Sequence, residues 1–186
     1  MHPKLIALVF SFFFLVISFS QNKKTPIPAT LNELHYYNKS NDALQLLEKG
    51  KADFVSKAKG FGFGGATTNF ELSGDKSTAR VVSNDSVSFV VSLAGGAGDP
   101  GTLFSLFKVE LKKGKRIANY INTRVYGGKN GSGDGIISFS VKRIGDQVFE
   151  LIPSVKLEKG EYLFVNKATL ANYGGRGADA FAFGVD

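Results

Sequence analysis

The chain has 186 residues, of which 22 are glycine, 17 are phenylalanine and none is cysteine. The lack of cysteine excludes a disulfide framework, thiolate metal sites and a cysteine nucleophile. Lys and Arg number 23 against 16 Asp and Glu, so the formal net charge is +7. This excess favours anionic partners at the surface but carries no information about the fold.

The first twenty residues have the order of a secretory signal peptide. Lys4 gives a basic start, an apolar run from Leu5 to Ile17 follows, and Ser18 and Ser20 are the small residues before a cut at Gln21. The alternative is a membrane anchor, but a spanning helix needs about 20 apolar residues and this run is shorter. We therefore expect an exported protein, periplasmic or extracellular, with no transmembrane segment in the mature chain.

Beyond the signal, residues 21–32 are polar with two prolines and are expected to form a loose leader. Apolar residues then alternate with polar ones in short segments separated by glycine-rich turns. The clearest segments cover residues 86–93, 103–111, 136–144 and 180–185. This pattern predicts an all-β fold, an antiparallel β-sandwich of jelly-roll or Greek-key type, as one domain over residues 33–186.

The stretch "NDALQLLEKG", residues 41–50, is ambiguous. Asn41 or Asp42 could cap a helix rich in Leu, Gln and Glu. The same residues could instead form the second strand of a hairpin whose first strand is "ELHYY". We favour the hairpin.

The glycines of "GFGFGG", residues 60–65, match the dinucleotide-binding pattern G-x-G-x-x-G. That pattern requires a helix directly after it to hold the pyrophosphate. Here Thr67, Thr68 and Phe70 follow, which favour a strand. We therefore expect no nucleotide cofactor, and interpret the segment as a strand with Phe61 and Phe63 on one face. Its bare glycine face would allow close approach, most often by an aromatic ring. The last strand has the same pattern, with Phe181 and Phe183 opposite small residues, and we expect both in one sheet.

The segment "LEKGEYLF" spaces Leu157, Gly160 and Tyr162 as L-x-x-G-x-Y. This spacing resembles the tyrosine corner of Greek-key sandwiches, in which a Tyr near a strand start bonds back to the preceding backbone. An ordinary turn before a strand is the alternative. Together with the export signal and the glycine-rich strands, the segment resembles exported bacterial all-β proteins of unassigned function. That resemblance implies an architecture and no site residues.

Catalytic motifs are not evident in this sequence. The mature chain would keep one histidine, His35, and has no G-x-S-x-G elbow for a serine hydrolase. Glu71, Glu110 and Glu150 fall within predicted strands, so a carboxylate pair could meet across a sheet and hydrolyse a glycan. We expect a non-catalytic protein, with a small envelope hydrolase using strand carboxylates as the alternative.

The loop "NGSGDGII" partly matches a calcium loop, with oxygen ligands at Asn130, Ser132 and Asp134. The position for the closing bidentate Glu is occupied by Val141, so the charge is too low for Ca²⁺. We expect no metal, but keep Asn130 and Asp134 as candidate ligand-binding residues.

A second candidate loop is "NYGGRGAD", which contains Tyr173, Arg176 and Asp179. Loops on rigid sandwiches often bind ligands, so we expect recognition by these residues if loops 95–101, 127–135 and 173–179 gather at one end. The basic run Lys112–Arg116 is interpreted as a solvated hairpin turn. The predicted function is therefore an exported non-catalytic binding or structural module of the cell envelope. Its partner would be an anionic glycan or another envelope component, and not nucleic acid.

Overall fold

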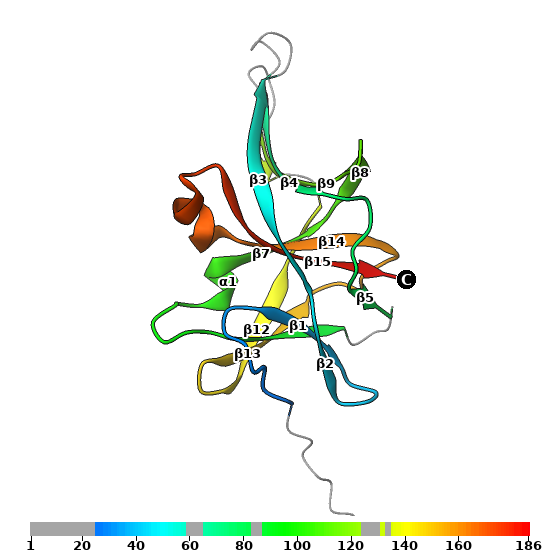
Figure 1. Ribbon diagram of the computed structural model, residues 1–186, viewed down its shortest axis with the longest axis vertical. Coiled ribbons are helices and arrows are strands. Elements are labelled where there is room, and N and C mark those ends of the chain that lie inside the picture. The colour runs from blue at the N-terminus through cyan, green and yellow to red at the C-terminus, as the bar shows by residue number, and fades with distance from the viewer. Residues whose placement is uncertain (1–24, 59–64, 83–86, 124–130, 133–134) are drawn as a thin grey trace, which may run out of the picture.

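The computed structural model describes residues 25–58, 65–82, 87–123, 131–132 and 135–186. Two antiparallel sheets pack face to face, and the larger one curls into a half-barrel (Figure 1). The predicted all-β sandwich is therefore confirmed. No helix in the described part of the chain has both the length and the apolar composition to cross a membrane.

The smaller sheet contains β1 (Leu34–Asn38), β2 (Ala43–Leu46), β6 (Ser88–Ser92), β12 (Phe139–Gly145) and β13 (Val148–Pro153). Its strand order is β12-β13-β6-β1-β2. Strands β1 and β2 pair in antiparallel register, with His35 opposite Leu46. The predicted hairpin is therefore confirmed over the helix. Its turn is fixed by Asp42, which has a φ of 59° and accepts a 2.6 Å hydrogen bond from the Tyr37 hydroxyl.

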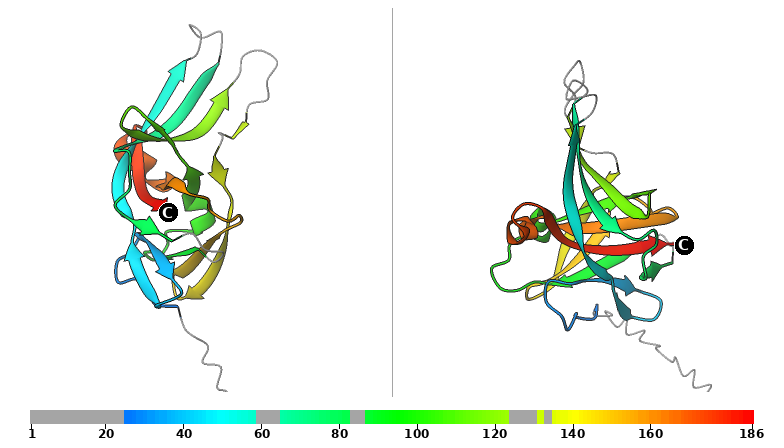
Figure 2. Two further views of the ribbon diagram at one scale, coloured as in Figure 1. Left: turned by 90° about the vertical axis from the view of Figure 1, so that its right-hand side faces the viewer. Right: turned by 45° about the horizontal axis from the view of Figure 1, so that its top comes forward.

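The larger sheet contains β3 (Glu48–Ala58), β4 (Ala66–Ser73), β5 (Arg80–Val81), β7 (Phe104–Lys108), β8 (Glu110–Lys112), β9 (Lys115–Thr123), β10 (Gly131–Ser132), β11 (Ile136–Ile137), β14 (Gly160–Asn166) and β15 (Gly177–Val185). The main order is β10-β9-β4-β3-β15-β14-β7-β11; β5 pairs with β15, and β8 with β9. The two edge strands, β10 and β11, are separated in the chain by residues 133–135 only. These two strands are therefore close in the chain although they lie at opposite ends of the strand order. The far ends of β3, β4 and β9 extend away from the smaller sheet (Figure 2).

Strands β14 and β15 separate two hydrophobic cores. Phe181 and Phe183 of β15 face the core between the sheets, where Phe183 lies 4.7 Å from Phe89 between ring centroids. Ala180 and Ala182 face the interior of the half-barrel. The predicted alternation along the last strand is confirmed. Along β15, small side chains line the interior of the half-barrel, while the phenylalanines fill the space between the two sheets.

The tyrosine corner is present. The Tyr162 hydroxyl donates a 2.7 Å hydrogen bond to the Glu158 carbonyl oxygen, and the Tyr162 ring is buried. Leu157 is buried as well, and Gly160 has a φ of 151°, a conformation that favours glycine. The L-x-x-G-x-Y spacing therefore predicted both the contact and the start of β14.

Two predicted strands are divided in the structure. The segment 103–111 breaks at Val109, because β7 pairs with β14 whereas β8 pairs with β9. The segment 136–144 breaks at Ser138, because β11 pairs with β7 in the large sheet and β12 with β13 in the small one. In both cases the pairing partner changes without interrupting the alternation of side chains, so periodicity does not reveal the break.

The described part of the leader contacts the smaller sheet. The Asn32 amide donates to the Ser92 carbonyl at 2.7 Å, and the Asn32 side chain accepts from the Ala94 amide at 3.1 Å. Pro28 is buried. Residues 1–20, with the predicted signal peptide, lie outside the described residues.

Residues 59–64, which hold most of the "GFGFGG" segment, are also outside the described residues. The chain enters them from β3 and leaves them into β4, and Ala58 pairs with Ala66. A strand therefore follows the glycines, where a dinucleotide fingerprint requires a helix.

Candidate functional site

The predicted loop residues Tyr173, Arg176 and Asp179 lie where the 3₁₀ helix η2 (Lys167–Tyr173) joins β15. Helix η2 begins at Asn166, whose side chain accepts from the Ala168 amide at 3.1 Å. It ends at Gly174, which has a φ of 60°. The chain therefore reverses sharply after Tyr173 and presents a short exposed loop before entering the sheet.

Tyr173 is fixed by two neighbours. Its hydroxyl donates a 2.7 Å hydrogen bond to Asp179 Oδ1, and this bond raises the pKa of Tyr173. Lys51 Nζ lies 4.9 Å from the centre of the ring, a cation–π contact. Lys51 is positioned by the pairing of β3 with β15, which places it opposite Asp179. The Asp179 amide is held by Thr169 Oγ1 at 2.7 Å.

Arg176 is exposed at the tip of this loop. Its carbonyl oxygen accepts from the Phe54 amide at 2.9 Å, so its backbone is anchored to β3. Within the described residues, no hydrogen bond or ion pair of its guanidinium group is present. Lys51, Tyr173, Arg176 and Asp179 are referred to below as the Tyr173 patch. The patch offers a cation, an aromatic edge and a carboxylate, which are groups that bind acidic sugars and hydroxyls.

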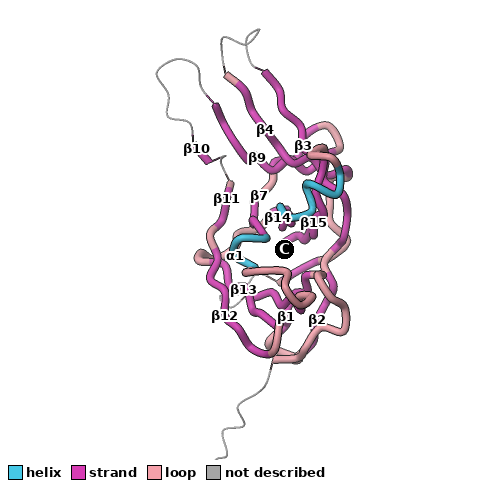
Figure 3. The backbone as a smooth tube through the Cα atoms, turned by 90° about the vertical axis from the view of Figure 1, so that its left-hand side faces the viewer, coloured by secondary structure: helices cyan, strands magenta, loops and turns pink. Residues whose placement is uncertain are grey.

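The gathering of the three loops at one end stays a prediction. The loop 95–101 leads into α1 (Pro100–Leu103), and α1 lies on the same side of the molecule as η2 (Figures 1 and 3). Asn130 and Asp134 of the third loop lie outside the described residues. Gly135 has a structural role, because a Cβ there would lie 2.6 Å from the Lys108 carbonyl oxygen.

Each of the strand carboxylates proposed for hydrolysis has a polar or cationic partner in the structure. Glu71 is buried, with Lys57 Nζ 2.5 Å from one carboxylate oxygen and Lys115 Nζ 2.8 Å from the other. Hydrogen bonds from these lysines hold the pKa of Glu71 below its usual value. Glu150 is buried, and its Oε1 lies 3.6 Å from Lys39 Nζ. Glu110 is exposed, and its Oε1 accepts a hydrogen bond from Asn119 Nδ2.

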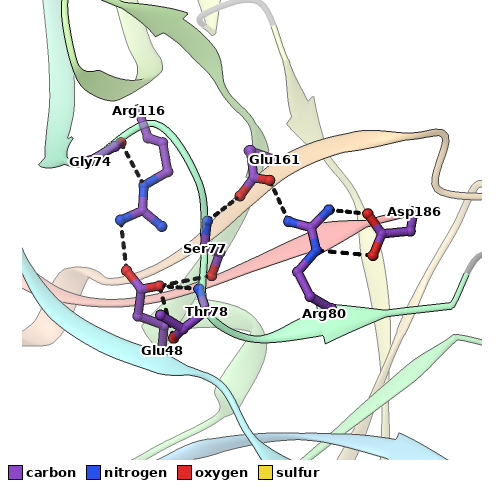
Figure 4. Close-up of polar contacts among 8 residues, drawn as sticks. All are labelled: Glu48, Gly74, Ser77, Thr78, Arg80, Arg116, Glu161 and Asp186. Carbon is purple, nitrogen blue, oxygen red and sulfur yellow. Dashed lines mark hydrogen bonds and ion pairs between the residues drawn. The ribbon is translucent and has the colours of Figure 1, made fainter.

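A polar network that sequence reasoning missed joins β3, β9 and the segment 74–82, here called the strap (Figure 4). Arg116, assigned by sequence to a solvated turn, is buried with only 2% of its surface exposed. It donates to Glu48 Oε1 at 2.6 Å and to the carbonyl oxygens of Ser73 and Gly74 at 2.8 and 3.1 Å. The turn itself is confirmed, because Lys112 pairs with Lys115 and both Lys113 and Gly114 have positive φ.

Glu48 and Glu161 hold the strap from two sides. Glu48 Oε2 accepts from the Thr78 amide at 2.6 Å and from the Ser77 hydroxyl at 3.1 Å, and Glu161 accepts from the Ser77 amide at 2.8 Å. Burial would raise the pKa of Glu48, but the hydrogen bonds from Arg116 and Thr78 outweigh it and lower that pKa. Both carboxylates therefore accept hydrogen bonds that fix the backbone of the strap.

Arg80 ties the strap to the last strand. It pairs with Glu161 at 2.5 Å and forms two hydrogen bonds with Asp186, whose pKa is lowered by them (Figure 4). A Cβ at Gly184 would lie 1.6 Å from Arg80 Nη1. On the last strand, the space left by the missing side chain of Gly184 is therefore occupied by the guanidinium group of Arg80. The glycine face predicted at residues 60–64 lies outside the described residues.

His35 is buried on β1 and has a structural environment. Its Nδ1 lies 3.2 Å from the Glu33 carbonyl oxygen, and its Nε2 lies 3.5 Å from Thr30 Oγ1. Burial lowers the pKa of His35. In the ranges that the structure describes, His, Asp and Glu side chains form no group of three that could hold a metal ion.

A pocket of about 210 Å³ lies between the end of β13 and the tyrosine corner. Its walls are Val87 and the segment 152–157, which is largely apolar and contains one lysine and one serine. None of the described residues that line this pocket is a carboxylate.

No family model, no curated protein and no solved structure matches this chain. The function of the protein must therefore be inferred from the geometry and chemistry of its own side chains.

Proposed function

We propose that this protein is an exported, non-catalytic β-sandwich module of the cell envelope that binds a glycan or another envelope component. The Tyr173 patch carries the proposal. It combines an exposed guanidinium group without a partner in the described residues with an aromatic ring held by Asp179 and Lys51. Both sit on a loop whose backbone is anchored to β3 and to η2. A rigid loop loses little conformational entropy on binding.

The state of the buried carboxylates supports a binding role over hydrolysis. A general acid needs a raised pKa to hold its proton near neutral pH. Glu71 and Glu48 have lowered pKa values, because cationic side chains bind them. Glu161 is likewise paired with Arg80 at 2.5 Å. These carboxylates are used to hold strands and the strap in place.

The proposal is tested by measuring binding of the purified protein and two variants to a panel of neutral and acidic glycans. Arg176→Ala should weaken binding to a panel member by about tenfold, or roughly 1.4 kcal/mol, because a charge-assisted hydrogen bond is lost. The Arg176 side chain makes no described contact, so the fold should be unchanged.

Lys142→Ala is the matched control, because Lys142 is an exposed cation on β12 of the other sheet. Its affinity should stay within about twofold of the parent. Equal losses in both variants would mean that binding follows total charge rather than the patch. Absence of binding to every glycan and envelope polymer tried would reject the proposed function.

A further inference from the structure

The strap, the β8–β9 turn and the turn before β14 lie on one side of the molecule, near the last residue (Figures 1 and 2), and together they carry four lysines. These residues, referred to as the basic rim, are Lys76, Lys112, Lys113 and Lys159. All four are exposed. They come from three separate elements, namely the strap, the β8–β9 turn and the turn before β14.

Backbone and electrostatic contacts connect these elements in one sequence. The Gly74 amide donates to the Gly114 carbonyl at 2.9 Å, which places the start of the strap, and with it Lys76, beside the turn that carries Lys112 and Lys113. Lys76 and Lys159 both help to lower the pKa of Asp186, so both lie within electrostatic reach of that carboxylate. The rim therefore runs from the β8–β9 turn along the strap to the turn at Lys159.

The charge of the rim is not neutralised within the described molecule. None of its four lysines forms an ion pair with a described carboxylate. The nearby acids are already engaged: Asp186 and Glu161 bind Arg80, and Glu158 binds Lys108. Asp75 and Glu110 have no cationic partner there. With Arg80 and Lys108 counted beside the acids that they bind, six positive charges face five negative ones, which is a local excess of one.

We infer that the basic rim docks a linear polyanionic polysaccharide. The four lysines come from three elements, and a polymer with repeated charges can contact one element after another along the rim. Lysine ammonium groups are flexible point charges, suited to a diffuse and salt-sensitive association rather than to one fixed anion. The inference rests on the proposed binding role and specifies that the bound partner is negatively charged.

The experiment uses heparin as the polyanion and neutral dextran as the uncharged polymer, with affinity measured over a series of salt concentrations. The parent protein should bind heparin and not dextran. The variant Lys76→Gln/Lys112→Gln should bind heparin at least fivefold more weakly, and the slope of log affinity against log salt should fall by about one to two.

The matched control is Lys142→Gln/Lys167→Gln, which removes the same charge from β12 and η2. This control should stay within about twofold of the parent. Equal losses in both double variants, no binding to heparin, or binding only to vesicles of anionic phospholipid would each overturn the inference. If Arg176→Ala weakens binding to a glycan while the rim variants do not, the rim inference fails and the proposed function stands.

Discussion

At the scale of single residues, Gly184 illustrates how a missing side chain creates space for a charged one. The guanidinium group of Arg80 occupies the place where a Cβ of residue 184 would lie. From there Arg80 reaches both Glu161 and Asp186. Any side chain at position 184 would displace the arginine and separate it from Glu161, which is buried.

Gly184→Ala is therefore expected to lower the free energy of unfolding by about 1–3 kcal/mol, the usual cost of overpacking. The measurement is urea denaturation followed by circular dichroism. Gly95→Ala serves as its control, because a Cβ at Gly95 would meet nothing within 4 Å. If both variants are equally stable, the position of the Arg80 side chain does not depend on the missing side chain of Gly184.

At the scale of elements, charged side chains from neighbouring strands hold the strap in place. Arg116 from β9 and Glu48 from β3 form a pair whose side chains are 3% and 21% exposed. Arg116 also binds the carbonyl oxygens at the end of β4. Removing one member of such a pair leaves the other charge poorly solvated.

Arg116→Ala should lower the free energy of unfolding by about 3 kcal/mol, at the low end for buried pairs because Glu48 keeps some contact with water. Arg143→Ala removes an exposed arginine that pairs with Asp146, with side chains 62% and 91% exposed. That change should cost less than about 1 kcal/mol. Similar losses in the two variants, measured by urea denaturation, would contradict the assigned role of Arg116.

At the scale of the whole molecule, the shifted groups make the fold sensitive to acid. The pKa of His35 in the folded protein lies below its ordinary value of 6.5. As the pH falls, the unfolded chain therefore binds a proton at this residue before the folded chain does. Its contribution to stability is complete above about pH 6.5 and is lost as the pH falls toward the folded value. Glu48 and Glu71 also have lowered pKa values, and their contribution is lost only below about pH 4.5.

The urea midpoint should therefore fall in two steps as the pH is lowered from 8 to 3. His35→Gln keeps a side chain that can donate to the Glu33 carbonyl but removes the titrating ring. In this variant the first step, which begins near pH 6.5, should disappear, while the acidic step below about pH 4.5 remains. Persistence of the first step in His35→Gln would show that another group causes it.

The strand content and several local contacts could be predicted because they depend on neighbouring residues in the chain. Alternation along residues 180–185 indicated the two faces of β15, and the spacing of Leu157, Gly160 and Tyr162 predicted the tyrosine corner. Tyr173 and Asp179 were selected from one loop, and the structure joins them at 2.7 Å. Lys51 was not selected, because its contact with Tyr173 depends on the register between β3 and β15.

The sequence by itself determined that the chain alternates its side chains, turns at glycines and folds into sheets, because these properties follow from backbone conformation over a few residues. Only the tertiary structure decided where β7 and β11 end and that Arg116 is buried. It also decided that the guanidinium group of Arg80 lies against Gly184. These outcomes depend on which strands pair across long stretches of chain. An arginine in a basic turn is buried only when a distant glutamate, here Glu48 on β3, is brought beside it.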